Sequence, residues 1–433
     1  MQFGFDLFVD LGAIAIALLA ATFLRTKIGF LQRYLVPNAL TAGFILLPLY
    51  NWVMPVMGLG TGNLEALAFL LLGISFAAMS LRNGPRGPRI RGTAFAMGVG
   101  VISQMALQAI IGLALTMVLM ATIQPQIFYP FGMLMPLGFS QGPGQALSIG
   151  ASWASAGIEG AGSVGLTFAA IGFILACVGG VFLINYGVRR GWTTQKMREA
   201  LQDGAVKRGV LSSSADRPIG ARLSTETEAI DSLSFNVALV LLAYFAAYLF
   251  LLAITTPLYN LGPDLARLAD TLWGISFIFA SLAALVLRSV LRAMKLDYVV
   301  DNLTLSRVTG LSVDIMVASA IGAISIAVVG QYWIAILVIA LIGATVTALT
   351  VPWLSSRIFR DHAFQRMILV FGISTGTLST GLALLRVLDP EFETPVASDY
   401  AVASAIVLPI AIPLIVAISL PLRAHTTGDP LYM

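Results

Sequence analysis

Long apolar runs recur along this chain, and the segments between them hold most of its charged residues. A helix that crosses a bilayer needs about 20 predominantly apolar residues. Runs of about this length lie at residues 7–25, 35–55, 63–81, 93–120, 164–188, 233–255, 270–290, 304–327, 332–354 and 398–422. The pattern therefore predicts an all-α polytopic membrane protein with about ten transmembrane helices.

Two further segments, residues 126–160 and 365–396, are apolar but interrupted by Gly, Pro and Ser. Both contain a Gly-x-Ser-x-Gly pattern, at Gly138–Gly142 and Gly372–Gly376. Gly- and Ser-rich backbone at membrane depth has polar groups that lipid cannot satisfy, so such segments are buried in protein or line a polar cavity. We expect each segment to form a re-entrant hairpin. Breaks at corresponding places in two halves of a chain are typical of a transporter's binding centre.

The basic residues indicate the orientation. With the N-terminus placed outside, all but three of the 25 Lys and Arg residues fall on the cytoplasmic side, as the positive-inside rule requires. The exceptions are Arg267, Arg386 and Arg423. Five spans on each side of a central loop give the two halves opposite orientations. We therefore predict an N-terminal repeat over residues 1–188, a cytoplasmic linker over 189–231 and an inverted C-terminal repeat over 232–433, with both termini outside.

Composition supports the membrane class and excludes others. Hydrophobic residues make up 58% of the chain and charged residues 11%, whereas soluble domains carry about 25% charged residues. A single cysteine, Cys177, and two histidines, His362 and His425, exclude a disulfide framework and a multi-Cys or His-rich metal centre. The net charge of +4 arises mainly in loops that flank the spans. We therefore expect the lipid bilayer, and no nucleic acid, as a partner.

Several short motifs resemble those of one transporter family. They are FLQRYLVPN at residues 30–38, LLGIS at 71–75, QAIIG at 108–112, SQGPG at 140–144, and the glycines Gly372 and Gly376. In order and spacing they resemble the bacterial sodium/glutamate symporter family, in which a Ser-Gly-Gly-His-Gly motif occupies the place of SQGPG. This chain departs from the family pattern at Gln141, Pro143 and Ser374.

The resemblance implies a secondary active transporter of the bacterial inner membrane, in which Na⁺ entry drives symport of glutamate or a similar small carboxylate. It also implies a homodimer that works by an elevator-type alternating-access mechanism. In that family the third to fifth spans of each half move with the hairpins, and the earlier spans hold the dimer together.

The hairpin tips supply the candidate binding groups. Free N–H groups at half-helix N-termini suit a carboxylate, and free carbonyls suit Na⁺. The alternative is close helix packing through small residues, because both patterns also fit Gly-x-x-x-Gly. With Gln108 and Asp314 from neighbouring spans, the candidates are Ser140, Gln141, Gly142, Gly144, Gln145, Gly372, Ser374, Thr375, Gly376 and Thr377. We expect the two tips to approach each other, and a Cβ at Gly142 or Gly376 to be obstructed.

Three polar positions outside the tips have alternative interpretations. Asp314 lies well inside a span, so it is a candidate for Na⁺ or proton coupling, or else an interfacial acid paired with Arg307. Gln104 and Gln108 share a helix face and either bond a neighbouring helix or line a polar path. Arg386 could bind a substrate carboxylate, but we favour a structural pair with nearby acids.

Three other functions are alternatives to Na⁺ symport. A proton- or sodium-coupled carrier for another organic anion is favoured by Pro143, which replaces the histidine of the family motif. A channel needs a continuous pore with repeated polar rings, whereas here the polar breaks are concentrated at two tips. Gly-x-Ser-x-Gly also occurs in hydrolases, but there it requires a strand–turn–helix and a histidine partner. We therefore predict that the protein is not an enzyme.

Overall fold

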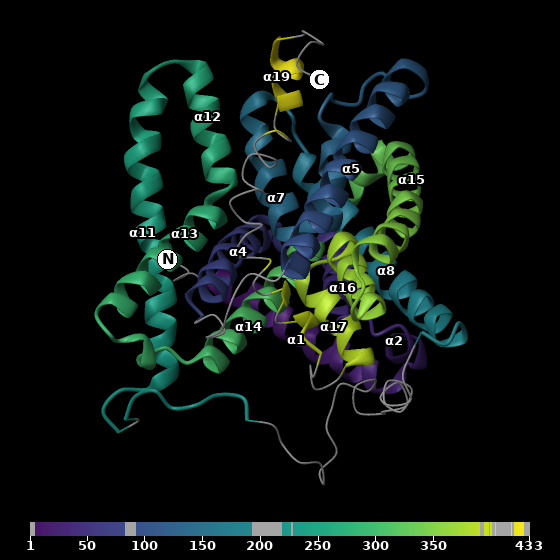
Figure 1. The fold of residues 1–433 in the computed structure, drawn as a ribbon. Coiled ribbons are helices and arrows are strands. Elements are labelled where there is room, and N and C mark those ends of the chain that lie inside the picture. Colours follow the sequence, from purple (N-terminus) through teal and green to yellow (C-terminus); the bar gives the residue numbers. More distant parts are fainter. Residues whose placement is uncertain are drawn as a thin grey trace.

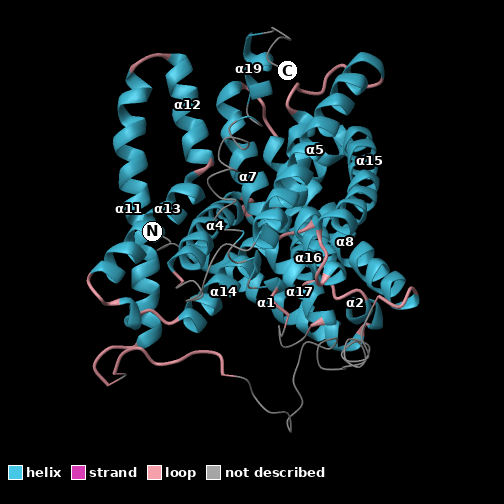
Figure 2. Cartoon of the chain, viewed as in Figure 1, coloured by secondary structure: helices cyan, strands magenta, loops and turns pink. Residues whose placement is uncertain are grey.

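The computed structural model describes residues 5–82, 92–192, 219–226, 228–389, 394–397, 399–400, 403, 417 and 420–427. Within these ranges the regular structure is helical throughout (Figure 2). Nine of the described helices are long and apolar enough to cross a bilayer. This confirms the prediction of a polytopic helical membrane protein. Most of the tenth predicted span, residues 398–422, lies outside the described residues.

The long helices follow the predicted spans closely. They are α1 (Phe5–Lys27), α3 (Asn38–Pro48, continued by irregular helical turns to Met57), α4 (Gly62–Leu81), α5 (Gly92–Thr122), α8 (Ala161–Arg189), α11 (Ser232–Asn260), α13 (Ser276–Ala293), α14 (Asn302–Gly322) and α15 (Ile326–Ile358). Shorter helices connect them. These are α2 (Gly29–Arg33), α6 (Leu134–Pro136), α7 (Pro143–Ser152), α12 (Pro263–Gly274), α16 (Ala363–Thr375), α17 (Leu378–Leu388) and α19 (Leu420–Thr427).

The helices form two packed groups (Figure 1). In the first bundle α3, α4, α13 and α14 pack against one another, with α1 beside α3 and α11 beside α13. In the second bundle α5, α8 and α15 pack around the two interrupted segments, α6–α7 and α16–α17. The family resemblance implied that α4, the third span, would group with the hairpins. Among the described residues it packs mainly along α14 and α13, and it also packs against α7 of the first interrupted segment.

Small residues bring the helices of the first bundle together. Its core contains Ala77, Ala243 and Ala284, all buried. A Cβ on Gly73 of α4 would lie 2.5 Å from the Tyr244 ring on α11, so only glycine permits this approach. Small residues at helix contacts are what a bilayer favours, because association there relies on close packing rather than on burial from water.

The predicted span 270–290 is divided in two. Helix α12 ends at Gly274, and α13 begins at Ser276 after a bend. At this bend α7 of the second bundle comes close, since a Cβ on Gly274 would lie 2.8 Å from Oγ of Ser152. The apolar run predicts one helix here, whereas the structure has two, divided where a distant part of the chain packs against them.

Two charged residues are buried where the sequence analysis did not place them. Arg366 was counted among the cytoplasmic loop residues, but it lies in the first turns of α16 with 0% of its surface exposed. Asp10, near the start of α1, is also buried. Its carboxylate accepts hydrogen bonds from the Tyr50 hydroxyl and from Nδ2 of Asn63, the latter at 2.7 Å. Arg366 pairs with Asp361 and Asp399. Both buried charges therefore have polar partners, as burial of a charge requires.

Candidate functional site

The first interrupted segment changes direction at Gly142. A 3₁₀ turn (Phe131–Met133), α6 and a π-helical turn (Leu137–Gln141) lead to this glycine, which has φ 88° and ψ 179°. Glycine adopts a positive φ at little cost, whereas residues with a Cβ do not. Pro143 then opens α7, because proline suits the first turn of a helix. The local sequence therefore produces a helix end, a sharp turn and a new helix.

The second interrupted segment turns at Gly376 and Thr377. Helix α16 ends at Thr375, and α17 begins at Leu378. The two helices then pack against each other. A Cβ on Gly372 would lie 2.6 Å from Cα of Gly381, which explains why glycine is needed where these helices cross.

The two breaks meet. Oγ of Ser140 donates to the carbonyl of Ser374 at 3.3 Å, and these residues stand 234 positions apart, at the same place in the repeated pattern. Gln108 of α5 joins them: its Oε1 accepts from Oγ of Ser140 at 2.7 Å, and its Nε2 donates to the carbonyl of Ser374 at 2.9 Å. The prediction that the tips approach each other is confirmed.

The N-termini of α7 and α17 lie side by side at this meeting point. A Cβ on Gly142, which precedes α7, would lie 2.5 Å from Cγ2 of Thr377, which precedes α17. Neither residue caps the following helix with a side-chain hydrogen bond. The first turn of a helix has backbone N–H groups without partners inside the helix and a positive partial charge, so two adjacent N-termini attract an anion.

Two buried polar atoms at the breaks lack a hydrogen-bond partner among the described residues. They are Oγ of Ser374 and Oε1 of Gln145. Ser374 is fully buried, and Gln145 lies in the first turn of α7. Buried polar groups are nearly always satisfied. The two atoms are therefore available to a ligand or to water.

The remaining candidates serve packing more than the meeting point. Nε2 of Gln141 lies 3.0 Å from Sδ of Met105, and Oγ1 of Thr375 donates to a carbonyl of its own helix. Gly144 permits close packing against Met316 of α14. Sequence reasoning missed Thr347 of α15, whose Oγ1 accepts from Nε2 of Gln108 at 3.0 Å. Its partnership with Gln108 could not be read from hydropathy.

Gln104 and Gln108 bind a neighbouring helix, one of the two predicted alternatives. Oε1 of Gln104 accepts from Oγ1 of Thr350 at 2.8 Å, and Gln108 bonds Thr347, so α5 and α15 are joined by two polar contacts. Gln108 additionally reaches both breaks. The shared helix face was predicted correctly, and only Gln108 belongs to the candidate site.

Asp314 lines a cavity between the two bundles. The cavity has a volume of about 290 Å³ and lies between α14 of the first bundle and α8 and α17 of the second. Its walls include Asp314, Phe173 and Thr380, and Thr380 is three residues past the second break at Thr377. In the described part of the chain no ion pair joins Asp314 to Arg307, whose Nε donates to the carbonyl of Gly220.

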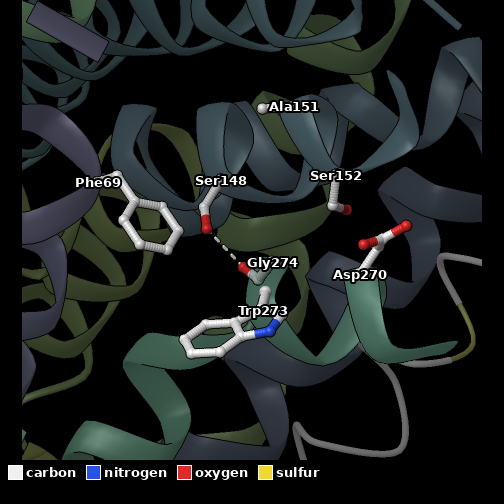
Figure 3. A pocket seen from close by; sticks show the side chains of 7 residues that line it. All are labelled: Phe69, Ser148, Ala151, Ser152, Asp270, Trp273 and Gly274. Atoms are coloured by element: carbon white, nitrogen blue, oxygen red, sulfur yellow. Dashed lines mark hydrogen bonds between the residues drawn. The ribbon is translucent and has the colours of Figure 1, made fainter. Parts of the chain in front are cut away.

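A second cavity, of about 330 Å³, lies beside the C-terminal half of α7 (Figure 3). It is formed by α4, α7 and α12, and its walls include Phe69, Asp270 and Trp273. At its base Oγ of Ser148 on α7 donates to the carbonyl of Gly274 at 2.5 Å. This hydrogen bond joins the second bundle to the first.

Arg386 is exposed and lies in the second half of α17. The acid of the predicted pair that the structure describes, Asp389, is buried, and its Oδ2 accepts from the N–H of Thr394 at 2.9 Å. Glu391 and Glu393 lie outside the described residues.

Comparisons of the chain with known protein families, characterised proteins and solved structures found no match.

Proposed function

We propose that this protein is a secondary active transporter that moves a small carboxylate, glutamate or a similar acid, together with Na⁺. The observation that carries the proposal is the meeting of two broken helices at Ser140, Ser374 and Gln108. Unwound backbone inside a helical membrane protein is costly unless it serves a cavity or a ligand. Two uncapped N-termini there suit the carboxylate of a substrate, and unwound carbonyls suit Na⁺.

Contacts between corresponding helices support an inverted repeat with two re-entrant hairpins. Helix α4 packs on α14, α5 packs on α15, and the first break packs on α16. These pairs occupy matching positions in the two halves of the chain. Elements related by a pseudo-two-fold axis meet in this way when they lie near the axis. In this arrangement the substrate binds on the axis, between the tips.

The boundary between the bundles suits alternating access. The Asp314 cavity opens that boundary beside α17, next to the second break. On the other side of the breaks, the Ser148–Gly274 hydrogen bond holds α7 against the first bundle. Movement of the second bundle along the first would break this hydrogen bond and expose the tips on the opposite side. The first bundle then acts as the fixed scaffold, and a second copy of the chain completes a homodimer.

A proton-coupled carrier for another organic anion is the second candidate. Asp314 favours it, because its carboxylate lines the cavity beside the second break and is titratable. An acid within a span is a usual element of a proton relay. The same carboxylate equally suits Na⁺, so the two couplings differ in the ion and not in the residue.

Uptake by purified protein in liposomes tests the proposal. Radiolabelled glutamate should accumulate with an inward Na⁺ gradient and should not accumulate with a K⁺ gradient of the same size. A panel of labelled acids with and without amino groups would identify the substrate. Accumulation driven by a pH gradient alone would favour the second candidate, and equilibration without accumulation under any gradient would contradict both.

Replacement of Asp314 by asparagine is expected to weaken coupling. The change removes the charge and keeps the size, so the ion concentration for half-maximal uptake should rise roughly tenfold, the loss expected for one charged hydrogen bond. The measurement is uptake against Na⁺ concentration in liposomes. Asp297→Asn, in the turn before α14, is the matched control and should leave the curve unchanged. An unchanged curve for Asp314→Asn would remove Asp314 from the coupling site.

The predicted orientation can be tested with two exposed leucines at opposite ends of α11. Leu223 precedes α11 and Leu261 follows it. In a Cys177→Ala background, a cysteine at Leu223 should react with an impermeant maleimide only from the cytoplasmic side. A cysteine at Leu261 should react only from outside. The reverse pattern would overturn the orientation.

A further inference from the structure

The cavity beside α7 has a chemistry that the breaks lack. It measures about 330 Å³ and opens between α7 and α12, and Figure 3 shows the side chains of Phe69, Trp273 and Asp270 around it. Ser148 and Ser152 add two hydroxyl groups from α7. The walls therefore combine one carboxylate, two aromatic rings and two hydroxyls.

The electrostatics of the cavity favour a cation. Asp270 supplies a negative charge, held in place by the Tyr259 hydroxyl, which donates to Oδ1 at 2.8 Å. Ser152 is the last residue of α7, so the cavity also lies at the negative end of that helix dipole. The opposite end of the same helix, at Gly142, borders the proposed carboxylate site. One short helix thus presents its positive end to the breaks and its negative end to this cavity.

The aromatic walls select the kind of cation. The Trp273 ring packs against that of Tyr248, with ring centroids 5.7 Å apart, so its position is fixed by the first bundle. Phe69 is half-buried on α4. Ring faces attract ammonium groups that carry alkyl substituents. A bare Na⁺ instead prefers to be surrounded by oxygen ligands, which two aromatic walls cannot supply.

We propose that this cavity binds an organic ammonium group, with Asp270 as its counter-ion and Trp273 and Phe69 as its aromatic walls. Such a group has two sources. One is the amino group of an acid that binds in this cavity before it reaches the breaks, because the ten residues of α7 separate the two sites by about 15 Å; this assignment rests on the proposed function. The other is a separate small amine, which does not require transport at all.

Binding of ethylammonium to the purified full-length protein in detergent tests the proposal without any transport assay. Saturation-transfer NMR titration should give saturable binding of ethylammonium and none of ethanol, its neutral counterpart. Asp270→Asn should raise the Kd about tenfold or more, because it removes the counter-ion. Trp273→Leu should raise it roughly threefold. Asp6→Asn, which removes an exposed acid on α1, is the matched control and should leave the Kd unchanged.

Each outcome decides the proposal. Absence of saturable ethylammonium binding, or equal Kd values for Asp270→Asn and the unchanged protein, would overturn it. If Asp270→Asn is not monodisperse, Trp273→Leu provides the test, and an unchanged Kd there is the negative result. Uptake of glutamate in liposomes can succeed or fail independently, so the two proposals are not confounded.

The source of the ammonium group follows from a second comparison. Glutamate and glutarate share two carboxylates and differ in the amino group. If the substrate supplies the ammonium group, Asp270→Asn should weaken glutamate binding and leave glutarate binding unchanged. If glutamate binding is unaffected while ethylammonium binding is lost, the site serves a separate amine. Both results support an ammonium site.

Discussion

Replacement of Gly142 by valine is expected to abolish substrate binding and uptake. Gly142 has a φ of 88°, which a β-branched residue adopts only with strain. A Cβ at this position would also lie 2.5 Å from Cγ2 of Thr377, so it would push the N-terminus of α17 away from that of α7. Because the proposed carboxylate site lies between these two N-termini, we expect no measurable glutamate uptake in liposomes at substrate concentrations that saturate the unchanged protein.

Two control variants separate this effect from general strain. Gly157 also has a positive φ, 81°, but no atom lies within 4 Å of its would-be Cβ. Gly157→Val therefore introduces the strain without the collision, and should retain uptake. Ser140→Ala keeps the backbone and loses the hydrogen bond to Gln108, about 0.5–1.5 kcal/mol, so affinity should fall roughly two- to tenfold. Equal uptake by Gly142→Val and Gly157→Val would contradict the site.

Gly376 illustrates a limit of pattern-based prediction. Gly142 and Gly376 end the same five-residue pattern, which predicts that a Cβ is obstructed at both. Gly376 has a φ of −132°, and its would-be Cβ would lie 3.0 Å from Cβ and Oγ1 of Thr380. The predicted obstruction is confirmed at both positions. It is severe at Gly142, where the conformation also excludes a Cβ, and moderate at Gly376, where a neighbouring side chain must shift.

The spans could be predicted because a bilayer permits few backbone conformations in a segment that crosses it. Runs of about 20 apolar residues must form helices there, and the predicted 7–25, 63–81 and 304–327 are found as α1, α4 and α14. The meeting of the breaks could also be predicted, because the same five-residue pattern interrupts two apolar segments, and interrupted backbone in a membrane protein has to be buried against other protein. These inferences depend on length and order, which a single sequence contains.

Other features depend on contacts that no local pattern records. Hydropathy cannot show that α4 packs along α14 and α13, since every span is apolar. It also cannot show that Arg366 pairs with Asp399, 33 residues further along the chain. A basic residue near a helix end predicts a wetted loop by default. Only the fold shows that Asp399 lies beside Arg366, so that the arginine can be buried.

Removal of the Asp399 carboxylate is expected to destabilise the second bundle strongly. Nη2 of Arg366 lies 2.7 Å from Oδ2 of Asp399 and 2.9 Å from Oδ2 of Asp361. The Arg366 side chain is fully buried and that of Asp399 is 9% exposed, whereas that of Asp361 is 53% exposed. Asp399→Asn leaves the buried Arg366 with only the exposed Asp361 as its charged partner, and breaking a buried pair costs about 3–5 kcal/mol. Asp399→Asn should therefore lower the Tm of the purified protein markedly.

Asp361→Asn is the matched control, because it removes the exposed partner of the same arginine. Exposed pairs contribute only about 0–1 kcal/mol, so its Tm should fall slightly. Burial acts to raise the pKa of Asp361, but the hydrogen bond and charge of Arg366 outweigh it and lower the pKa. The stabilisation from the Asp361–Arg366 ion pair is thus fully present at pH values above 3.8, the usual pKa of the Asp361 carboxyl. It is lost as the pH falls through the lowered pKa. The Tm values of Asp361→Asn and the unchanged protein should converge in that acidic range.

A double variant identifies the cause of the Asp399→Asn effect. Arg366→Met with Asp399→Leu removes both charges and keeps the buried volume nearly constant. Buried ion pairs replaced by apolar residues of similar size often lose little stability, so the double variant should recover most of the Tm lost by Asp399→Asn. Equal Tm values for Asp399→Asn and Asp361→Asn would show that burial does not govern this pair. Failure of the double variant to recover would show that Arg366 is held by more than its charge, for example by its contact with Sδ of Met97 at 2.9 Å.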